Sequence, residues 1–506
     1  MTNHLFEMFR ERMPSPEMTF IETSDGTRIT YGAAVALSGR LANALVRRGI
    51  APGDRIAVQV EKSPQAVLLY LASVRCGAIF VPLNTAYTLA ELEYFIGDCE
   101  PRIVVCAPDK AAALAPVTRR YCSEIDTLDA SGNGSIIDLA KRELPHFEDV
   151  GRTPDDLVAL LYTSGTTGRS KGAMLTHGNL ASNAETLCDH WRFTREDRLL
   201  HALPIFHTHG LFVAINVTLM AGSSMLFLPK FDADTIMRLL PSVTCMMGVP
   251  TFYVRLAEHP ALSRETTRHM RLFVSGSAPL LSDTHAVWKE RTGHAILERY
   301  GMTETNMITS NPYDGPRIAG AVGQKLPGVE IRITDPGTGA LVPQGDIGMI
   351  EVMGPNVCAG YWRNPEKTRA DFRADGFFIT GDLGRIDEHG YLFIVGRGKD
   401  LIISGGYNVY PKEIETEIDE LAGVIESAVI GLPHRDLGEG VTAVVVARPS
   451  SGATEQTILA ALRHRIAKFK LPKHILFVDA LPRNAMGKVQ KNILRESYSS
   501  LYSGQR

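Results

Sequence analysis

The chain has 506 residues, a length sufficient for two or more domains and a large hydrophobic core. Hydrophobic residues make up 44% and charged residues 22%, and the formal net charge is -3, so the composition is that of an ordinary globular protein without the basic excess typical of nucleic-acid binding. The seven cysteines are odd in number and include no Cys-x-x-Cys pair, which argues against a disulfide framework and a zinc site. We also expect no signal peptide, because the first residues are neither basic nor apolar, and we therefore predict a cytoplasmic protein.

The first third of the chain alternates between two patterns. Three times a segment with apolar residues at helical spacing is followed by one of strand length: 30–45 then 54–60, 63–76 then 78–83, and 88–98 then 103–106. This alternation predicts a doubly wound α/β unit, a fold that binds ligands at the ends of its strands.

The segment 162–172 is rich in glycine and hydroxyl side chains and lies between two apolar segments, 157–161 and 173–175. Glycine lets backbone N–H groups turn toward an anion, the hydroxyls add donors, and Lys171 adds a positive charge. The segment therefore predicts a polyphosphate-binding loop between two strands, with ATP as its ligand. Its spacing differs from the P-loop pattern Gly-x-x-x-x-Gly-Lys-Ser/Thr, and a polar, flexible hairpin is the alternative.

The next segments alternate between apolar core and polar clusters. Residues 201–211 hold three histidines, but no cysteine or acidic residue stands at a ligand spacing, so we do not expect a metal there. Residues 211–228 are apolar, yet polar residues interrupt them and Ala221-Gly222 divides them into a helix and a strand, so we expect buried core and no membrane association. Residues 245–256 predict a strand followed by a helix, with Arg255 in its first turns, where an arginine is most often a solvated surface residue.

Two later turns have the chemistry of a nucleotide site. The buried strand that begins at residue 272 opens into small residues at Ser277, Ala278 and Pro279, which allow a flat base to approach the backbone closely. Asp382 follows a glycine turn and offers a carboxylate to the two vicinal hydroxyls of a ribose.

The C-terminal part predicts a separate small domain. A glycine-rich segment at 396–406 precedes alternating helix and strand patterns: helices at 411–421 and 455–469, and strands at 427–431, 441–446 and 474–478. We therefore predict one domain at 1–396 and a second, α+β domain at 397–506. Lys488 lies beside a glycine in a loop near its end, where most lysines are simply solvated.

Five motifs together resemble those of the adenylate-forming superfamily, which includes acyl-CoA synthetases, adenylation domains and firefly luciferase. In chain order they are the loop 162–172, Tyr300-Gly301-Met302-Thr303-Glu304, Thr380-Gly381-Asp382, the hinge-like segment 396–406, and Pro482 to Lys488. Over nearly its full length the chain most resembles the malonyl-CoA synthetases of bacteria. The resemblance implies a large N-terminal domain of doubly wound sheets and a small, mobile C-terminal domain.

The resemblance also implies a reaction in two steps. Malonate attacks MgATP to give malonyl adenylate and pyrophosphate, and coenzyme A then displaces AMP, with methylmalonate as a possible further substrate. Lys488, Glu304, Thr303 and His207 would be catalytic, with Glu304 as the Mg²⁺ ligand. Lys399 would be the hinge residue about which the small domain turns between the steps. Because Lys488 acts through its charge, a protein lysine acetyltransferase is a further implied partner.

The implied contacts fall into two groups. The nucleotide and coenzyme A contacts are Thr163, Ser164, Gly165, Thr166, Thr167, Gly168, Lys171, Ser277, Ala278, Pro279, Glu298, Arg299, Tyr300, Gly301, Asp382, Arg397, Lys399, Ser404, Gly405 and Gly406. The contacts of the acid are Arg255, Ser277, Thr208, Met302 and Met307. Arg255 would pair with the distal carboxylate of malonate, and Arg299 is the second candidate for this role.

Three alternatives stay open at this point. The first is a synthetase for an aromatic or fatty acid, and the second is an adenylation module that loads a carrier protein. The third is a nucleotide-binding regulatory protein without catalytic activity. The presence of Lys488 and Glu304 argues against the third.

Overall fold

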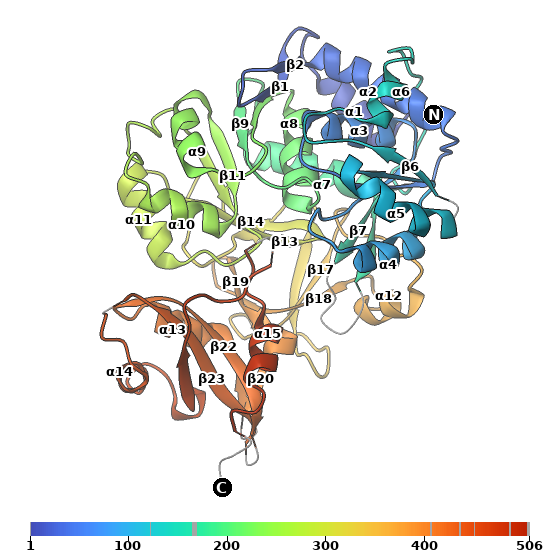
Figure 1. Ribbon diagram of the computed structural model, residues 1–506. Helices are drawn as coiled ribbons and strands as arrows, with labels where there is room; N and C mark the ends of the chain where they lie inside the picture. Colours follow the sequence, from blue (N-terminus) through green and yellow to red (C-terminus); the bar gives the residue numbers. More distant parts are fainter. Residues whose placement is uncertain are drawn as a thin grey trace.

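The structure is a computed structural model that describes residues 2–121, 123–163, 170–404, 407–434, 437–449, 451–484 and 487–502. These residues form four β-sheets. Three of them belong to the large body of the molecule, and the fourth forms a smaller body below it, coloured orange to red in Figure 1. The α/β fold with a large and a small part agrees with the fold class predicted from the sequence.

The first sheet contains the N-terminal alternation of helices and strands. Its order is β6-β5-β3-β4-β7-β8, and all its pairs are parallel except the last. Its strands are β3 Arg55–Gln59, β4 Ile79–Pro82, β5 Ile103–Cys106, β6 Glu124–Thr127, β7 Leu157–Thr163 and β8 Lys171–Thr176. The helices of this region are α2 Tyr31–Arg47, α3 Pro64–Arg75, α4 Leu89–Cys99, α5 Pro108–Arg120, α6 Ser135–Ala140 and α7 His177–His190. The predicted polyphosphate-binding loop thus joins β7 to β8.

The second sheet has the order β15-β14-β13-β12-β11-β9-β10-β1-β2, with parallel strands from β13 to β1. Its strands are β1 Thr19–Thr23, β2 Arg28–Thr30, β9 Arg198–His201, β10 Ser224–Phe227, β11 Cys245–Gly248, β12 Leu272–Ser275, β13 Leu297–Met302, β14 Asn306–Ser310 and β15 Gln324–Lys325. The helices here are α1 His4–Arg12, the π-helix η1 His209–Ile215, α8 Asn216–Ala221, α9 Ala233–Leu239, the short η2 Leu240–Ser242, α10 Pro250–Glu258 and α11 Ser282–Thr292.

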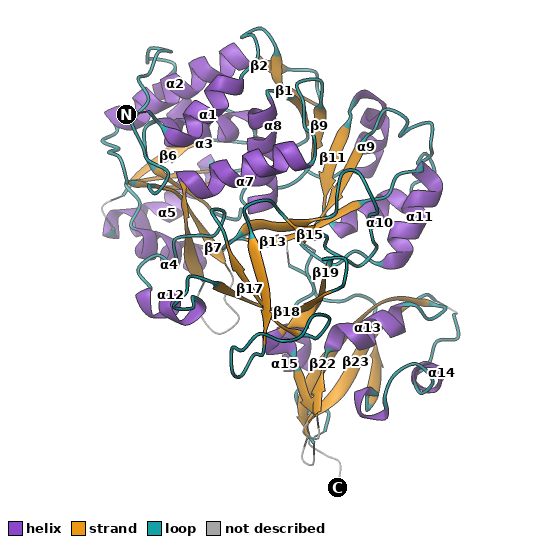
Figure 2. Cartoon of the chain, turned by 180° about the vertical axis from the view of Figure 1, so that it is seen from behind, coloured by secondary structure: helices purple, strands orange, loops and turns teal. Residues whose placement is uncertain are grey.

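The remaining two sheets are smaller, and Figure 2 shows them in the lower half of the molecule. The third is antiparallel, with strands β16 Glu330–Thr334, β17 Gly348–Met353, β18 Phe378–Ile386 and β19 Leu392–Arg397, and α12 Pro365–Asp371 beside them. The fourth contains β20 Ile402–Ser404, β21 Tyr407–Val409, β22 Val424–His434, β23 Gly438–Ala447 and β24 His474–Phe477. Its helices are η3 Gly398–Asp400, α13 Pro411–Asp419, α14 Glu455–Leu462, η4 Lys468–Lys470 and α15 Lys491–Ser497.

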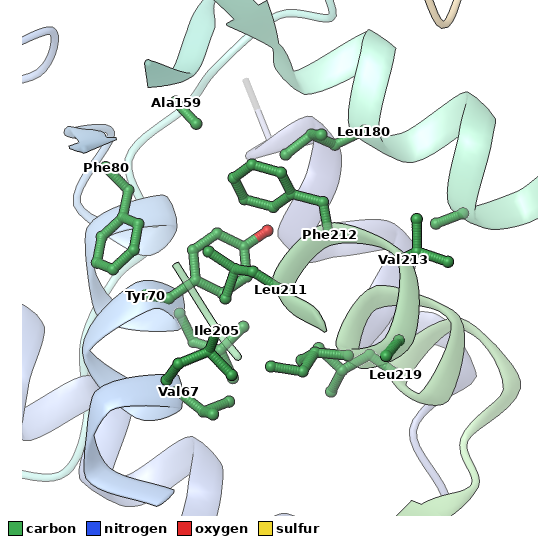
Figure 3. Close-up of a cluster of buried hydrophobic side chains, with 14 of the residues drawn as sticks. Val67, Tyr70, Phe80, Ala159, Leu180, Ile205, Leu211, Phe212, Val213 and Leu219 are labelled. Atoms are coloured by element: carbon green, nitrogen blue, oxygen red, sulfur yellow. The ribbon is translucent and has the colours of Figure 1, made fainter. Parts of the chain in front are cut away.

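One hydrophobic core joins the first two sheets. Figure 3 shows Tyr70 of α3 and Phe80 of β4 packed against Leu211 and Phe212 of the π-helix. Most of the segment 211–228 lies in this core, with Leu226 and Leu228 in a second buried cluster, so the segment is buried as predicted. It divides at Gly222, whose φ of 63° ends α8. Among the described residues, no helix has the length and apolar character that a membrane span requires.

Two sequence predictions of helices need correction. Arg255 lies in the last turn of α10, not in its first turns, because the helix begins at Pro250 and ends at Glu258. The helix predicted over 455–469 ends at Leu462, since the chain continues through turns into the short 3-10 helix at Lys468–Lys470. The division between domains at 396 and 397 stays a prediction. It falls at the end of β19, directly before the strands of the fourth sheet.

Candidate active site

The phosphate end of the candidate site is centred on Glu304, in the turn between β13 and β14. Its side chain is buried, and its Oε1 accepts hydrogen bonds from Tyr361 Oη at 3.1 Å and Thr163 Oγ1 at 3.4 Å. Burial raises the pKa of Glu304. Lys171 opens β8 and places its Nζ 5.5 Å from the centre of the Tyr361 ring. A carboxylate, two hydroxyls and an ammonium group therefore converge at the end of the predicted loop.

Several predicted contacts lie outside the described residues: Ser164, Gly165, Thr166, Thr167, Gly168, Gly405 and Gly406. Thr303 is half-buried, and Ser404 is buried at the end of β20.

Asp382 is held between two neighbours at the predicted ribose position. Tyr300 Oη donates to its Oδ2 at 2.5 Å, and Arg397 Nε donates to its Oδ1 at 2.6 Å. Asp382 and Arg397 are direct partners across β18 and β19. Each carboxylate oxygen has a second lone pair, so Asp382 retains acceptors for the hydroxyls of a ligand. These three predicted residues therefore form one unit.

The turn after β12 has a strained backbone. Ser277 has a φ of 74°, in the left-handed region that residues with a side chain seldom adopt. Such strain occurs mainly where the surrounding structure imposes it, often at functional sites. Ser277 Oγ lies 3.4 Å from His209 Nδ1, while Ala278 and Pro279 continue the turn toward the surface. The predicted small-residue turn is thus tied to the histidine segment.

Strand β13 sends alternate side chains to opposite faces, as any strand does. Glu298 and Tyr300 share one face, where the Gly320 N–H donates to Glu298 Oε1 at 3.1 Å and burial raises the pKa of Glu298 to about 8. Arg299 takes the other face. Gly301 follows at a β-bulge, and a side chain there would meet the Asn306 carbonyl oxygen at 1.9 Å, so only glycine fits the motif at this point.

The Arg299 side chain is buried, and two of the three nitrogen atoms of its guanidinium group have no hydrogen-bond partner. It is 3% exposed, and its Nε and Nη2 atoms make no hydrogen bond. The guanidinium lies against Gly276, where an added Cβ would be 2.3 Å from Arg299 Cζ. Burial lowers the pKa of Arg299 to about 9, so it remains charged at neutral pH. An unpaired buried cation costs several kcal/mol, which indicates a site prepared for an anion.

Other unpartnered polar atoms belong to the same region. Among the described residues these buried atoms without a hydrogen bond are His207 Nδ1, Thr208 Oγ1 and His209 Nε2. The Arg299 charge acts on both His207 and His209. Burial, followed by this charge, lowers the pKa of His207 to about 4, so its imidazole is neutral at pH 7. We call Ser277, Arg299 and the segment 207–209 the polar pocket.

Arg255 does not share this burial. Its side chain is exposed, and its Cζ lies 5.8 Å from the centre of the Phe231 ring. Met302 is half-buried at the end of β13, and Met307 is buried on β14. The strand pairing places Met307 opposite Gly301, beside the strand that carries Arg299.

Lys488 reaches the site from the small C-terminal part. Gly487, directly before it, lies against the start of α10, because a Cβ added to this glycine would be 3.2 Å from Thr251 Cγ2. Lys488 is exposed to solvent, and its side chain approaches charged groups of the site, Arg397 and Asp382 among them. Desolvation, followed by the charge of Arg397, lowers the pKa of Lys488 to about 8. Its charge also acts on His207, so the small part contributes a cation to the polar pocket.

Sequence reasoning missed Tyr361. This tyrosine lies in no motif that the sequence analysis singled out, yet it donates to Glu304 from 57 residues away. Tyr361 is held by an isolated antiparallel β-bridge to Ala173, a residue of β8. No local sequence pattern indicates a contact between segments so far apart in the chain.

Comparison with known proteins gives two family matches. The profile described as "AMP-binding enzyme" matches residues 9–362, and the one described as "AMP-binding enzyme C-terminal domain" matches residues 413–488. A malonate–CoA ligase from Arabidopsis thaliana is 35% identical over 89% of this chain and 79% of its own length. A feruloyl-CoA synthase from Amycolatopsis sp is also 35% identical, over 97% of both chains.

Solved structures are similar over the whole chain. ATP-bound MatB from Rhodopseudomonas palustris is 61% identical, with a TM-score of 0.98 over 99% of this chain and 100% of that one. Apo MatB from the same organism, with the same identity and coverage, gives a TM-score of 0.87. The present arrangement is therefore nearer to the ATP-bound form of MatB than to the apo form.

The contact of Gly276 with Arg299 gives a first prediction. Gly276→Ala is expected to lower the free energy of unfolding by about 1–3 kcal/mol, because the added methyl group overlaps the guanidinium. In an Arg299→Ala background that space is free, and the same change is expected to cost less than about 0.5 kcal/mol. Urea unfolding of the four proteins measures both values, and an equal cost in the two backgrounds would contradict the contact.

Proposed function

The chain belongs to the AMP-binding enzyme family, and from that premise we propose that it is a malonyl-CoA synthetase. A carboxylate oxygen of malonate attacks the α-phosphorus of ATP, the bond to pyrophosphate breaks, and malonyl adenylate forms. The coenzyme A thiolate then attacks the acyl carbon, and AMP leaves with the electrons of the broken C–O bond. The overall products are malonyl-CoA, AMP and pyrophosphate.

The unpaired Arg299 guanidinium is the observation that carries the choice of acid. The relatives named for malonate and for ferulate are equally identical to this chain, at 35%, so these two do not decide it, whereas MatB is more similar than either, at 61%. A fatty or aromatic acid would leave a buried cation unpaired, whereas malonate offers it a second carboxylate. A guanidinium suits this role because it donates to both oxygens at once.

Arg255, the first candidate of the sequence analysis for the distal carboxylate, becomes the second candidate in this proposal. Its exposed position over Phe231 supports this role less well than the burial of Arg299 does. Thr208, Met302 and Met307 limit the space beside Arg299 in our proposal, with Ser277 as a neutral donor. A methyl group at C2, as in methylmalonate, would be accepted or refused by these side chains.

Binding of ATP is assigned to the two groups built around Glu304 and Asp382. Tyr300 stacks on adenine, Asp382 with Arg397 binds ribose, and Lys171 with Thr163 binds the outer phosphates. Glu304 suits Mg²⁺, which takes one or two carboxylates and completes its shell with phosphates and water. In the part of the chain that the structure describes, no group of three acidic, histidine or cysteine side chains is arranged to hold a metal ion. When bound, Mg²⁺ would neutralise charge on the phosphates.

Lys488 is assigned to the first step only. Its ammonium group would offset the charge that grows between the α-phosphate and the attacking carboxylate. For the second step we propose that the domain 397–506 turns about Lys399, which withdraws Lys488 and brings Ser404, Gly405 and Gly406 to the thiol. The Asp400–Arg495 ion pair, at 2.6 Å, supports this assignment because it fixes the residue after Lys399 to helix α15 of the turning part.

We further propose a cytoplasmic location and regulation by a lysine acetyltransferase. The six cysteines among the described residues are all free and buried, which suits a reducing compartment. Lys488 keeps contact with solvent in a loop, so a modifying enzyme could reach it.

The proposed function is tested with a panel of acids. Wild type is expected to activate malonate with the highest kcat/KM among malonate, propionate, ferulate and a medium-chain fatty acid. Arg299→Ala is expected to lower kcat/KM for malonate by at least about 100-fold, and for propionate by less than about 10-fold, with KM for ATP unchanged. Arg255→Ala is the matched variant. A malonate-selective loss in that variant alone would transfer the role to Arg255, and a preference of wild type for ferulate or a fatty acid would refute the function.

The lowered pKa of Lys488 predicts a pH dependence. The charged form is the active one, so kcat/KM for pyrophosphate exchange should be constant at lower pH and fall as pH rises through about 8, well below the ordinary titration of lysine. Lys488→Arg keeps the charge at all these values and should move the decline from about pH 8 to about pH 9, where Arg299 titrates, even at a lower rate. A wild-type profile without a decline at about pH 8, or a decline that stays at about pH 8 in the arginine variant, would assign the titration elsewhere.

Acetylation of Lys488 is expected to stop the first step. Acetyl-lysine introduced at position 488 should lower malonate-dependent pyrophosphate exchange by at least about 100-fold, because the modification removes the charge. Thioester formation from supplied malonyl adenylate should continue. Acetyl-lysine at the exposed Lys473 is the control and should have no effect. Near-normal exchange by the protein acetylated at 488 would exclude the regulation.

A further inference from the structure

Lys62 is a lysine buried in the body of the molecule. It follows β3, and it is 8% exposed. Its Nζ lies 2.9 Å from His201 Nδ1, 2.9 Å from the His201 carbonyl oxygen, and 4.2 Å from the centre of the Phe227 ring. No carboxylate of the described residues lies within ion-pair distance of it. The contacts of Lys62 therefore centre on one histidine.

The hydrogen bonds of His201 fix the direction of this contact. His201 Nε2 lies 2.8 Å from the Gly210 carbonyl oxygen, which only accepts, so Nε2 carries the proton. In the neutral ring Nδ1 is then an acceptor, and Lys62 donates to it. Burial lowers the pKa of both Lys62 and His201 well below their ordinary values.

Gly210 closes a loop that we call the histidine loop, residues 202–209. A Cβ on Gly210 would lie 2.0 Å from the Pro204 carbonyl oxygen, so the two ends of the loop are in close contact. The Leu211 N–H also donates to the His207 carbonyl oxygen at 2.9 Å. Figure 3 shows Ile205, within this loop, and Leu211, directly after Gly210, packed in the hydrophobic core. The Lys62–His201 contact thus ends at the point where the loop closes.

The histidine loop supplies three members of the polar pocket, His207, Thr208 and His209. Each has a buried polar atom without a partner. Their positions depend on where the π-helix η1 begins, and π-helices are rare and often found at functional sites. An error of about 1 Å in such a position is enough to cost about 100-fold in rate.

We propose that Lys62 is a positioning residue of the polar pocket, which through His201 and Gly210 fixes the histidine loop against the acid substrate. The inference rests on the function proposed for that pocket. A role in filling the core alone would be served at lower cost by methionine or leucine, because a buried amine must be desolvated. Lysine has instead the length to reach from the end of β3, in the first sheet, to the end of β9, in the second.

Lys62→Met tests the proposal, because methionine has a similar shape and no donor. We expect KM for the acid to rise by about 10-fold or more, with KM for ATP changed by less than about 2-fold. The assay uses whichever acid wild type activates fastest, so its result does not depend on that acid being malonate. Lys110→Met is the matched control. Lys110 donates to Gln59 Oε1 at 3.2 Å and to the Thr85 carbonyl oxygen at 2.8 Å, beside the same strand but away from the loop.

A double-mutant cycle separates positioning from general destabilisation. His201→Phe should raise KM for the acid as Lys62→Met does, and the double variant should be no worse than His201→Phe, since Lys62 acts through His201. His201→Gln retains a donor toward Gly210 and should recover part of the loss. Additive effects, equal losses in both KM values, or an unchanged KM for the acid in Lys62→Met would overturn the proposal. If Lys62→Met does not fold, as judged by thermal unfolding, the two His201 variants decide the question.

Discussion

The alternation of side chains along β13 is the constraint on which the candidate site depends. Within three consecutive residues, Glu298 and Tyr300 face one side of the strand and Arg299 the other. Tyr300 thereby joins Asp382 and Arg397, while Arg299 joins the histidine loop. A slip of one residue in the strand register would exchange the two environments and bury the wrong group in each. One strand thus places a nucleotide unit and an acid pocket back to back.

Much of the fold could be predicted from the sequence because the N-terminal patterns are local. The helices and strands between residues 30 and 106 follow periodicities of a few residues. The predicted strands all belong to the first sheet, and the predicted helices alternate with them along the chain. The C-terminal helix predicted to reach residue 469 was too long, since turns end α14 at Leu462 despite the apolar residues beyond it. The π-helix at residues 209–215 was not predicted either, because its hydrogen-bond pattern depends on the loop closure at Gly210.

The motifs named groups that the structure brings together at the nucleotide end, but the sequence placed Arg255 before Arg299 for the distal carboxylate, the reverse of the order that their burial supports. Arg255 stood out because it follows a strand and a proline, whereas its exposure depends on how α10 packs and how far the helix continues. The burial of Arg299 depends on Gly276, which directly follows the neighbouring strand β12 and is 23 residues away. Lys62 gave no signal at all, since its partner His201 comes from another sheet, 139 residues along the chain. Such contacts arise only from tertiary packing.

The unpaired state of Arg299 also explains how selectivity against other acids would arise. The cost of burying this cation is present in the free protein and is relieved only when an anion reaches it. A monocarboxylate uses its one charge at the phosphate and leaves the guanidinium unpaired, so part of its binding energy is missing. Discrimination then has two sources. A monocarboxylate leaves the buried guanidinium unpaired, and malonate gains a contact with it. His207, whose pKa is lowered to about 4, is neutral at pH 7. It therefore adds no positive charge that would strengthen the binding of inorganic phosphate or of a trianion.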